Sequence, residues 1–442
     1  MASESYLVIG GEGFLGGRMV EMLLARYPSS AIGSLDIVQR RHSPKNHAGR
    51  AHWTFYRADL TDLEALTAAF RQSAATVVIH TASPHIGSPR EISEKINVTG
   101  TQTVVAACKA TGVKCLIYTS SSSVVYDGHH LTNIDERLPL PLKTLDPYSE
   151  TKARGELIVL DANTPGHFLT CALRPSGIFG PGDRQMIPGF IDVLKAGQTR
   201  LQIGNNVNLF DWTYVDNVCH AHFLAAEKLL QEFDDPKSAG VTADVFTHRL
   251  GPVESTIPRR DIPTTKKRAL AAELDARRLT RRQAAALEQS TDLSDEGIDA
   301  PLDARRNRFD QYFGADSVEE AQETYRVAGE AFNITNGEPT YFWDLGRYVW
   351  HEYNGHVPSS IISLPQWLAW YLGAGAELFG RLTGRVSKFS RFKVALCLND
   401  KYYNIEKARR VLGYEPIVSL QEGVRLAVAD FKQNERINEK AQ

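Results

Sequence analysis

Tyr6-Leu-Val-Ile-Gly10-Gly-Glu-Gly13-Phe-Leu-Gly16 places an apolar run directly before three spaced glycines. The run at residues 6–9 predicts a buried strand, and the pattern at residues 15–26 predicts an amphipathic helix. Glycines at such a turn let the backbone approach a phosphate, and the helix N-terminus stabilises negative charge. The sequence therefore predicts a dinucleotide-binding turn, made by Gly10, Gly13, Phe14, Leu15 and Gly16.

Short apolar runs alternate with amphipathic stretches beyond this turn. Strands are expected at residues 6–9, 31–37, 76–80, 115–119, 169–174 and 332–336, and helices at 15–26, 63–70 and 92–111. This alternation predicts parallel strands with helices on both faces of the sheet. We predict an α/β fold, a Rossmann-type doubly wound parallel sheet with a smaller C-terminal substrate-binding region.

Three regions differ in composition. Residues 1–232 are expected to form the dinucleotide-binding Rossmann domain, with an excursion to the substrate region at about 184–208. Residues 233–327 are rich in charge and poor in aromatic side chains, which predicts an insertion that is partly helical or disordered. Residues 328–442 are expected to supply the final Rossmann strand and the region that contacts substrate and membrane.

Composition narrows the class of protein. The chain has 442 residues, of which 43% are hydrophobic and 23% charged, so it has ample material for a large core. Its formal charge of -2 gives no global field that would attract nucleic acid, and we expect no nucleic-acid partner. Five scattered cysteines and no apolar leader before the first strand predict reduced thiols in a cytosol-facing protein.

Asp36 closes the expected second strand, about twenty residues beyond the glycine turn. A carboxylate at this place accepts hydrogen bonds from the adenosine ribose hydroxyls and repels a ribose 2′-phosphate. Ile37 and Val38 supply no cation, so NAD is favoured over NADP, although Arg40 and Arg41 follow closely. The structural alternative for Asp36 is a carboxylate that merely caps a turn.

Asp59 and Leu60 follow another strand-like stretch. We expect them to accept from the adenine amino group. The structural alternative, which is compatible with that role, is that Asp59 only caps the helix that begins near Leu63.

The next candidates stand where the strand at residues 76–80 ends. Thr81, Ala82 and Ser83 are small, which leaves room for the nicotinamide ribose. His80 alone is expected to be a packed or hydrogen-bonded histidine. Asn97, on the following helix, is expected to anchor a water or a carbonyl group near Lys152.

Tyr148 and Lys152 are four residues apart, which puts a phenol and an ammonium on one face of a helix. A neighbouring cation lowers the pKa of a phenol, which is otherwise about 10, so that it can act as a general base. Ser121, after the strand at residues 115–119, is expected to hydrogen-bond the substrate oxygen. Alternation along that strand favours Ser121 over Ser122. This set predicts a hydride-transfer enzyme in which Lys152 also holds the nicotinamide ribose.

Metal ligands are not evident. The pairs His129-His130 and His220-Ala-His222 lack the spacing that places two imidazoles on one ion, and we predict no metal.

Residues 361–379, IISLPQWLAWYLGAGAELF, are mostly apolar but are interrupted by Pro365, Gln366 and Glu377. A spanning helix needs about 20 predominantly apolar residues, so we expect peripheral membrane contact or a lid over a lipid-like substrate. A buried core helix is the alternative. The basic clusters of residues 233–327 are read as a solvated face, with an anionic surface as the alternative.

Several longer strings resemble one family. They are VIHTASP (78–84), LIYTSSSSVVYDG (116–128), DPYSETKARGE (146–156), LRPSGIFGPGDRQMIPG (173–189), LFDWTYVDNVCHAHFLAAEKL (209–229), FNITNGEPTYFWDLGRYVW (332–350) and YNIEKARRVLGYEP (403–416). The chain resembles the 3β-hydroxysteroid dehydrogenase family of extended short-chain dehydrogenases/reductases, especially its decarboxylating fungal sterol enzymes. The resemblance covers most of the chain except residues 233–327.

This resemblance implies NAD-dependent oxidation of the 3β-hydroxyl of a sterol or triterpenoid, with decarboxylation of a 4α-carboxysterol to the 3-ketone. It carries the catalytic positions to Ser121, Tyr148 and Lys152, and it adds a stretch against the nicotinamide. That stretch is Pro175, Gly177 and Ile178. The resemblance further implies the cytosolic face of the endoplasmic reticulum, other sterol-demethylation enzymes as partners, and a homodimer through helices near residues 92–111 and 152–161.

Two other functions stay open. The fold also serves enzymes that act on nucleotide sugars or flavonoid-like ketones, but residues 186–201 offer few groups for a diphosphate beyond Arg184, Lys195 and Arg200. A protein that binds NAD without turnover is disfavoured because Tyr148 and Lys152 are both present.

Overall fold

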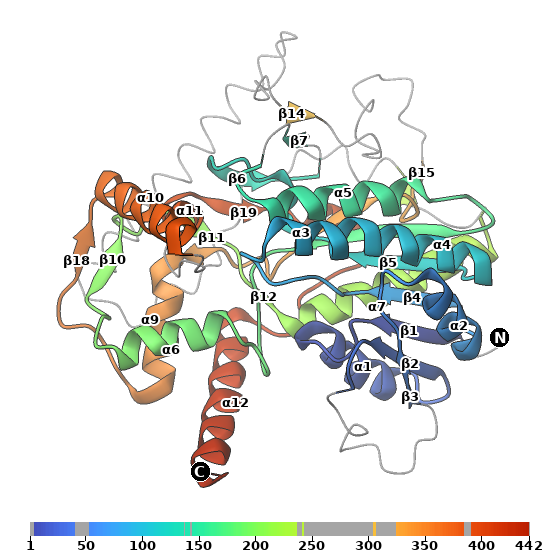
Figure 1. Ribbon diagram of the computed structural model, residues 1–442, viewed down its shortest axis with the longest axis horizontal. Coiled ribbons are helices and arrows are strands. Elements are labelled where there is room, and N and C mark those ends of the chain that lie inside the picture. The colour runs from blue at the N-terminus through green and yellow to red at the C-terminus, as the bar shows by residue number, and fades with distance from the viewer. Residues whose placement is uncertain are drawn as a thin grey trace.

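A seven-stranded parallel sheet forms the centre of the protein (Figure 1). The computed structural model describes residues 4–39, 53–136, 138–141, 144–236, 241–242, 304–305, 324–383 and 390–441. The strand order is β16-β8-β5-β4-β1-β2-β3. These strands are β1 (Ser5–Ile9), β2 (Ala31–Asp36), β3 (Trp53–Arg57), β4 (Val77–His80), β5 (Cys115–Thr119), β8 (Leu169–Pro175) and β16 (Ala331–Ile334). The order reverses at β1, and ligands bind beyond the strand ends at such a reversal.

Helices cover both faces of this sheet (Figure 1). Side chains of β1 alternate, so Val8 packs with the helices of one face and Leu7 with those of the other. One face is covered by α1 (Phe14–Arg26) and α7 (Val215–Asp234), and the other by α2 (Leu63–Ser73), α4 (Thr101–Thr111) and α5 (Pro147–Asp161). The doubly wound Rossmann-type prediction is confirmed.

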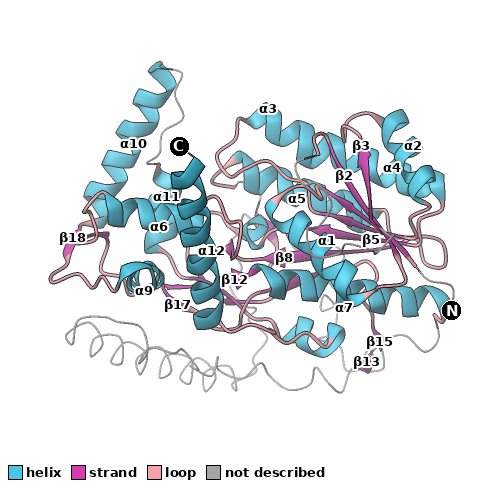
Figure 2. Cartoon of the chain, turned by 90° about the horizontal axis from the view of Figure 1, so that it is seen from below, coloured by secondary structure: helices cyan, strands magenta, loops and turns pink. Residues whose placement is uncertain are grey.

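A second region lies beside the sheet, on the left of Figure 1. Its four-stranded sheet has the order β17-β11-β19-β6, and β10 pairs with β18. Its helices are α6 (Met186–Lys195), α9 (Phe342–Asn354), α10 (Gln366–Thr383), α11 (Arg391–Leu398) and α12 (Leu420–Ala441). Its strands are β6 (Leu131–Ile134), β10 (Leu201–Ile203), β11 (Leu209–Phe210), β17 (Thr340–Tyr341), β18 (Ile362–Leu364) and β19 (Lys401–Tyr403). Figure 2 shows α12 on the side of α6 and α9 that is nearer to the central sheet.

Shorter elements complete the described chain. They are α3 (Arg90–Ser93), the π-helical turn η1 (Glu94–Gly100), the 3-10 helix η2 (Ser122–Val125), the π-helical turn η4 (Ala408–Leu412), β7 (Leu140–Pro141), β9 (Ile178–Phe179), β12 (Thr213–Tyr214), β13 (Val241–Thr242), β14 (Ala304–Arg305) and β15 (Thr324–Tyr325). β13 pairs with β15, so the chain leaves and re-enters close together around residues 243–323. Of the basic clusters noted in residues 233–327, only Arg305 of β14 falls within the described residues.

Two predicted elements differ from the structure. The helix expected at residues 92–111 is divided into α3, η1 and α4, and the wide turn η1 is held by hydrogen bonds from Asn97 to neighbouring elements. The apolar stretch at residues 361–379 is divided at Pro365 into β18 and α10. Most side chains of α10 are exposed, so the buried-helix alternative was wrong.

Candidate active site

The glycine turn lies at the end of β1, beside the reversal in strand order. Gly10 has a φ of +78°, and a Cβ there would approach the Ala82 backbone to 2.9 Å. A Cβ on Gly16 would lie 2.1 Å from the Gly10 carbonyl oxygen. Gly13 caps α1 without a side-chain hydrogen bond, and the first turn contains no acidic residue. The backbone N–H groups at this helix start therefore suit a pyrophosphate, with Phe14 and Leu15 in the first turn.

Asp36 ends β2 next to this turn. One carboxylate oxygen accepts the Glu12 backbone N–H at 3.2 Å, and the other accepts the Ile37 N–H at 2.8 Å. The carboxylate therefore stands at the edge where a bound adenosine ribose would lie. Arg40 and Arg41 lie outside the described residues.

Asp59 does not cap α2, so the structural alternative for this residue was wrong. The cap is Asp62, whose carboxylate accepts the Ala65 N–H at 3.0 Å. Asp59 instead accepts from both the N–H and the hydroxyl of Thr61, and these bonds lower its pKa. Leu60 packs against Gly100 of η1. Both residues flank the sheet edge, and their contact with adenine remains a prediction.

Thr81 and Ser83 follow the end of β4. The Thr81 hydroxyl donates to the Ile9 carbonyl at 2.8 Å, which fixes the chain beside the glycine turn. The Ser83 hydroxyl donates to the Asn97 side-chain oxygen at 3.2 Å, and the Asn97 amide donates to the Thr151 hydroxyl at 3.0 Å. Asn97 therefore links the end of β4 to α5, and its contact with a water or a carbonyl near Lys152 stays a prediction.

His80 is a packed histidine, as predicted. Its ring is fully buried, lies 3.3 Å from the Thr101 hydroxyl and contacts the Tyr118 ring. Burial lowers the pKa of His80 to about 3, so the imidazole is neutral.

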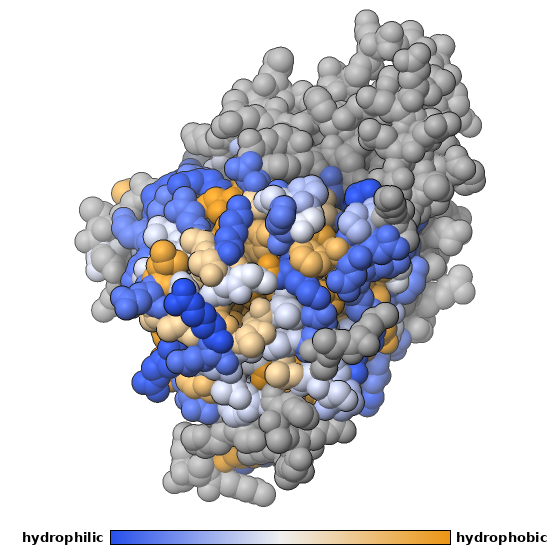
Figure 3. Space-filling model, turned by 90° about the vertical axis from the view of Figure 1, so that its right-hand side faces the viewer, coloured by the Kyte–Doolittle hydropathy of each residue, from blue (hydrophilic) through white to orange (hydrophobic). Residues whose placement is uncertain are grey.

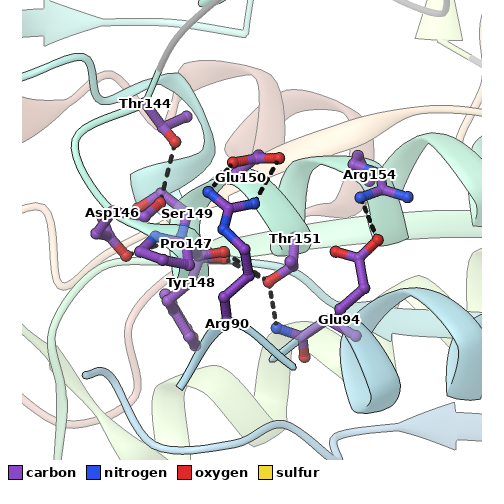
Figure 4. Close-up of polar contacts among 11 residues, drawn as sticks. Arg90, Glu94, Thr144, Asp146, Pro147, Tyr148, Ser149, Glu150, Thr151 and Arg154 are labelled. Carbon is purple, nitrogen blue, oxygen red and sulfur yellow. Dashed lines mark hydrogen bonds and ion pairs between the residues drawn. The ribbon is translucent and has the colours of Figure 1, made fainter. Parts of the chain in front are cut away.

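Ser121 and Tyr148 meet although they come from different elements. Ser121 caps η2 and its hydroxyl lies 2.8 Å from that of Ser123. Tyr148 stands in the first turn of α5, whose start is held by Asp146 through the Ser149 N–H and hydroxyl (Figure 4). Burial raises the pKa of Tyr148, and the nearby side chains of Ser83 and Ser121 partly oppose that rise. Their side chains therefore surround the phenol.

Strand alternation was the wrong reason for choosing Ser121. β5 ends at Thr119, and the serine run turns into η2 instead of continuing the strand. Ser122 is buried and uses its carbonyl to accept the Tyr403 hydroxyl at 3.1 Å. The chain turn, not the strand period, brings Ser121 to Tyr148.

The ammonium of Lys152 lies at the end of β5, and its effect on Tyr148 stays a prediction. It donates to the Thr119 carbonyl at 2.5 Å and lies 4.2 Å from the centre of the Tyr118 ring. Burial raises the pKa of Tyr148, with only the hydroxyls of Ser83 and Ser121 lowering it. Burial also lowers the pKa of Lys152 to about 7.

A buried ion pair behind the site was missed by the sequence analysis. Arg174 on β8 donates to both oxygens of Glu156 on α5, at 2.9 and 2.6 Å, and Ser120 donates to the same carboxylate at 2.7 Å. The Glu156 charge raises the pKa of Lys152 and opposes the effect of burial. The spacing of Lys152 and Glu156, four residues apart on one helix face, was the available signal.

The opposite wall of the site follows β8. Pro175 pairs with Ile334 of β16, and Ile178 pairs with Thr213 of β12. A Cβ on Gly177 would lie 2.9 Å from the Trp212 ring and 3.3 Å from the Phe210 ring. Gly177 therefore lets two aromatic rings approach the strand end, and this wall is apolar.

Metal chemistry has no visible support in the described part of the chain. No cluster of three or more His, Cys, Asp or Glu side chains there is arranged to hold an ion. The prediction of no metal is not tested by this observation.

The parallel sheet, the glycine turn and the Ser121–Tyr148–Lys152 set together define an extended short-chain dehydrogenase/reductase. The sequence pattern of the 3-beta hydroxysteroid dehydrogenase/isomerase family matches residues 7–255. The chain belongs to this family of oxidoreductases, as the resemblance predicted.

Relatives of similar length support this assignment. The chain is 34% identical to the decarboxylating sterol-4-alpha-carboxylate 3-dehydrogenase of Saccharomyces cerevisiae, covering 96% of this chain and 97% of the relative. It is 32% identical to the enzyme with the same description from Mus musculus, covering 96% and 90%.

The similarity to solved structures supports the assignment of the fold alone, because the sequence identities are low. A dTDP-glucose 4,6-dehydratase of Bacillus anthracis superposes with a TM-score of 0.58 at 16% identity, covering 98% of each chain. A UDP-glucose 4-epimerase of Thermus thermophilus gives a TM-score of 0.57 at 18% identity, covering 97% of this chain and 99% of the epimerase.

Proposed function

We propose that this enzyme oxidises the 3β-hydroxyl of a 4α-carboxylated sterol or triterpenoid with NAD, and that the product loses carbon dioxide to give the 3-ketone. One observation carries the proposal: the Tyr148 phenol stands between Ser83 and Ser121 in a chain that matches the yeast sterol enzyme along nearly its whole length. Such a reaction belongs to sterol synthesis or to related terpenoid synthesis.

NAD fits the residues at the sheet edge. Gly10, Gly13 and Gly16 leave a cradle without side chains, the start of α1 has no side-chain cap, and Asp36 ends β2 beside it. These residues would hold the pyrophosphate and the adenosine ribose. NAD, when bound, accepts the hydride from the carbinol carbon.

The proton is handled by the chain's own side chains. Tyr148 takes the proton of the substrate hydroxyl, and Ser121 donates a hydrogen bond to the same oxygen as it becomes a carbonyl. Ser83, Asn97 and Thr151 form a continuous hydrogen-bonded series that keeps the phenol in place. Lys152 would hold the nicotinamide ribose through N–H groups other than the one that it donates to the Thr119 carbonyl.

Oxidation prepares the second step. A ketone one bond from the carbon that bears the carboxylate makes the product a β-keto acid. The bond from C4 to the carboxyl carbon breaks, its electron pair forms the enolate, and carbon dioxide leaves. A proton then returns to C4. The protein needs to supply only the oxidation and a fitting pocket.

A nucleotide-sugar substrate is less well supported. Lys195 is one of three cations that residues 184–201 offer to a diphosphate, and it forms an ion pair with Glu435 of α12. The apolar wall formed by Gly177, Trp212 and Phe210 suits a hydrocarbon skeleton better.

Turnover of a 4α-carboxy-3β-hydroxysterol tests the proposal. We expect NADH and the decarboxylated 3-ketone, measured by absorbance and mass spectrometry. Tyr148→Phe should lower the rate by about 10²–10⁴-fold while NAD still binds. Tyr353→Phe, which removes a hydroxyl bound to Glu435 far from the site, is the matched control. A Tyr148→Phe enzyme as active as this control would contradict the assigned base.

Peripheral membrane contact is proposed for α10. Trp367, Tyr371 and Phe379 are 64%, 70% and 64% exposed on this helix. In contrast, hydrophilic and hydrophobic residues intermingle on the face shown in Figure 3. None of the described helices has both the length and the hydropathy that a membrane crossing needs. An amphipathic helix with exposed Trp and Phe inserts its apolar face among lipid headgroups.

Liposome sedimentation tests this contact. Trp367→Glu with Phe379→Glu should release the protein from liposomes. Ile437→Glu alters an exposed apolar residue of α12 and should not. Binding that survives the α10 substitutions would place the membrane contact elsewhere.

Location and assembly follow as further proposals. Membrane contact of this kind agrees with the cytosolic face of the endoplasmic reticulum, beside other sterol-demethylation enzymes. A homodimer through the outer faces of α4 and α5 is proposed by analogy with the fold. Light scattering after gel filtration measures the mass in solution, and a monomer would contradict the dimer.

A further inference from the structure

Lys401, at the start of β19, is a buried lysine without an acceptor in the described part of the protein. Its residue is 6% exposed, and its ammonium lies 4.7 Å from the centre of the Tyr126 ring and 5.9 Å from that of Phe210. No hydrogen bond or ion pair joins its ammonium to another described residue. The other two buried lysines differ, since Lys152 donates to a carbonyl and Lys407 pairs with Glu330.

The surroundings of Lys401 belong to the elements that carry the reacting side chains. Tyr126 directly follows η2, the short helix capped by Ser121. The carboxylate of Asp146, which acts on Lys401 through its charge, caps α5 two residues before Tyr148. β19 lies between β11 and β6 in the small sheet (Figure 1). Lys401 is therefore a cation beside the two elements, η2 and α5, that position Ser121 and Tyr148.

Phe210 connects Lys401 with Gly177, on the side of the site that follows β8. It is the residue of β11 that pairs with Lys401, and its ring also faces Gly177 beyond the end of β8. One aromatic ring therefore lies between Lys401 and the stretch assigned to the nicotinamide.

The Lys401 ammonium lacks the hydrogen-bond acceptor or the paired opposite charge that normally stabilises a buried charge. Burial lowers the pKa of Lys401 to about 8, and the charge of Asp146 opposes that effect, so the ammonium form prevails at neutral pH. The faces of two rings stabilise the cation partly, but they accept none of its three N–H donors. Asp146 already accepts from the Ser149 N–H and hydroxyl. A carboxylate brought by a ligand would complete this site.

We propose that Lys401 binds the 4α-carboxylate of the substrate. The inference rests on the proposed function, in which a carboxylate stands on the carbon next to the one that is oxidised. The ammonium selects the acid over sterols that lack the carboxyl group. After carbon dioxide leaves, the neutral ketone has no anion for Lys401, and this loss favours product release.

The test compares two substrates in three enzymes. The substrates are a 4α-carboxy-3β-hydroxysterol and the same sterol without the carboxyl group. The enzymes are wild type, Lys401→Met and Lys401→Arg. For Lys401→Met we expect kcat/KM on the acid to fall by roughly 10²-fold, mainly through KM, with little change on the neutral sterol. Lys401→Arg should keep most of the activity on the acid.

Lys407→Met serves as the matched control. It also removes a buried ammonium, but from the pair with Glu330, and it should lower stability without changing the preference between the two sterols. Melting temperature and NAD affinity report whether each variant is folded.

The outcomes separate the two proposals. If wild type turns over the acid, but kcat/KM of Lys401→Met falls equally on both sterols, the carboxylate role of Lys401 is overturned and the proposed function stands. If wild type turns over neither sterol, both fall together. If Lys401→Met does not fold, binding of a 3-deoxy-4α-carboxysterol and its methyl ester to wild type decides. Acid binding at least tenfold tighter supports the proposal, and equal binding overturns it.

Discussion

Three glycines of the opening turn are required for different physical reasons. Gly10 adopts a positive φ of +78°, which side chains disfavour. Gly16 has an ordinary helical backbone, but its Cα faces the Gly10 carbonyl so closely that a methyl group does not fit. Gly13 leaves the helix start without a side-chain cap. The spacing in the sequence identified all three, and the distances show which contact each one protects.

Gly16→Ala should lower both stability and NAD affinity. The new Cβ would lie 2.1 Å from the Gly10 carbonyl oxygen, so the turn must shift. We expect a loss of about 1–3 kcal/mol in unfolding free energy, measured by urea denaturation. Gly189→Ala on α6 is the matched control, because nothing lies within 4 Å of its Cβ. A Gly16→Ala protein as stable as this control would contradict the close contact.

Asp211 predicts a pH dependence of stability. Burial raises its pKa from 3.8 to about 7, so the folded state holds the proton more tightly than the unfolded state. Its stabilising contribution is complete below the ordinary pKa and is lost as the pH rises from 3.8 to about 7. Asp211→Asn keeps an acceptor for the Tyr403 N–H.

We therefore expect Asp211→Asn to become more stable than wild type as the pH rises through this window, by on the order of a few kcal/mol at neutral pH. Urea denaturation at a series of pH values measures the difference. A constant difference from acid to neutral pH would show that the Asp211 pKa is ordinary.

Helix α5 organises the site as one element. Asp146 caps it and Pro147 occupies its first turn. Tyr148, Lys152 and Glu156 recur every four residues, which aligns them on the face turned toward β5 and β8. Figure 4 shows its exposed side, where Arg90 pairs with Glu150 and Arg154 with Glu94. The helix is therefore anchored on its buried face by Glu156 and along its outer side by ion pairs.

Glu156→Gln should destabilise the protein strongly. The change leaves the buried Arg174 guanidinium without its carboxylate, which costs about 3–5 kcal/mol. It also removes the charge that raises the pKa of Lys152, so that pKa should fall further. Glu422→Gln removes a carboxylate from an exposed pair with Arg425 and should leave stability unchanged. Chemical denaturation of both variants measures the contrast, and equal stabilities would refute it.

The whole molecule is held by contacts between distant parts of the chain. One hydrophobic cluster runs from Val8 of β1 through Trp350 of α9 to Val424 of α12. Asn217, at the start of α7, joins the same parts by hydrogen bonds. Its amide donates to Asn336 and to the Val418 carbonyl, and its oxygen accepts the Ile417 and Val418 N–H groups.

Asn217→Ala should therefore loosen the C-terminal region relative to the central sheet. The buried N–H and carbonyl groups left without partners cost at least about 2 kcal/mol. Hydrogen exchange should increase in α12 more than in β1 to β5. Asn434→Ala, which removes a single exposed contact to Asp430, should change neither measurement. Uniform exchange across the chain would contradict the local effect.

Local patterns predicted much of the fold and the candidate site. Short apolar runs located the strands at residues 6–9, 115–119 and 169–174, because a parallel strand buried on both faces has nearly continuous apolar side chains. The four-residue spacing of Tyr148 and Lys152 placed both on one helix face. Individual contacts were not predicted: Asp62, not Asp59, caps α2, and the Thr119 carbonyl accepts from the Lys152 ammonium.

The order of residues by itself determined the Rossmann-type sheet, the glycine turn and the candidate residues, because periodicity and glycine spacing are local properties of the chain. Only tertiary structure decided how those residues meet. Ser83, Ser121 and Tyr148 come from three separate segments of the chain. The Arg174–Glu156 pair and the Lys401 ammonium differ from surface charges because they are buried. Burial sets both the cost of a charge and the partners within its reach, and neither can be read from positions along the chain.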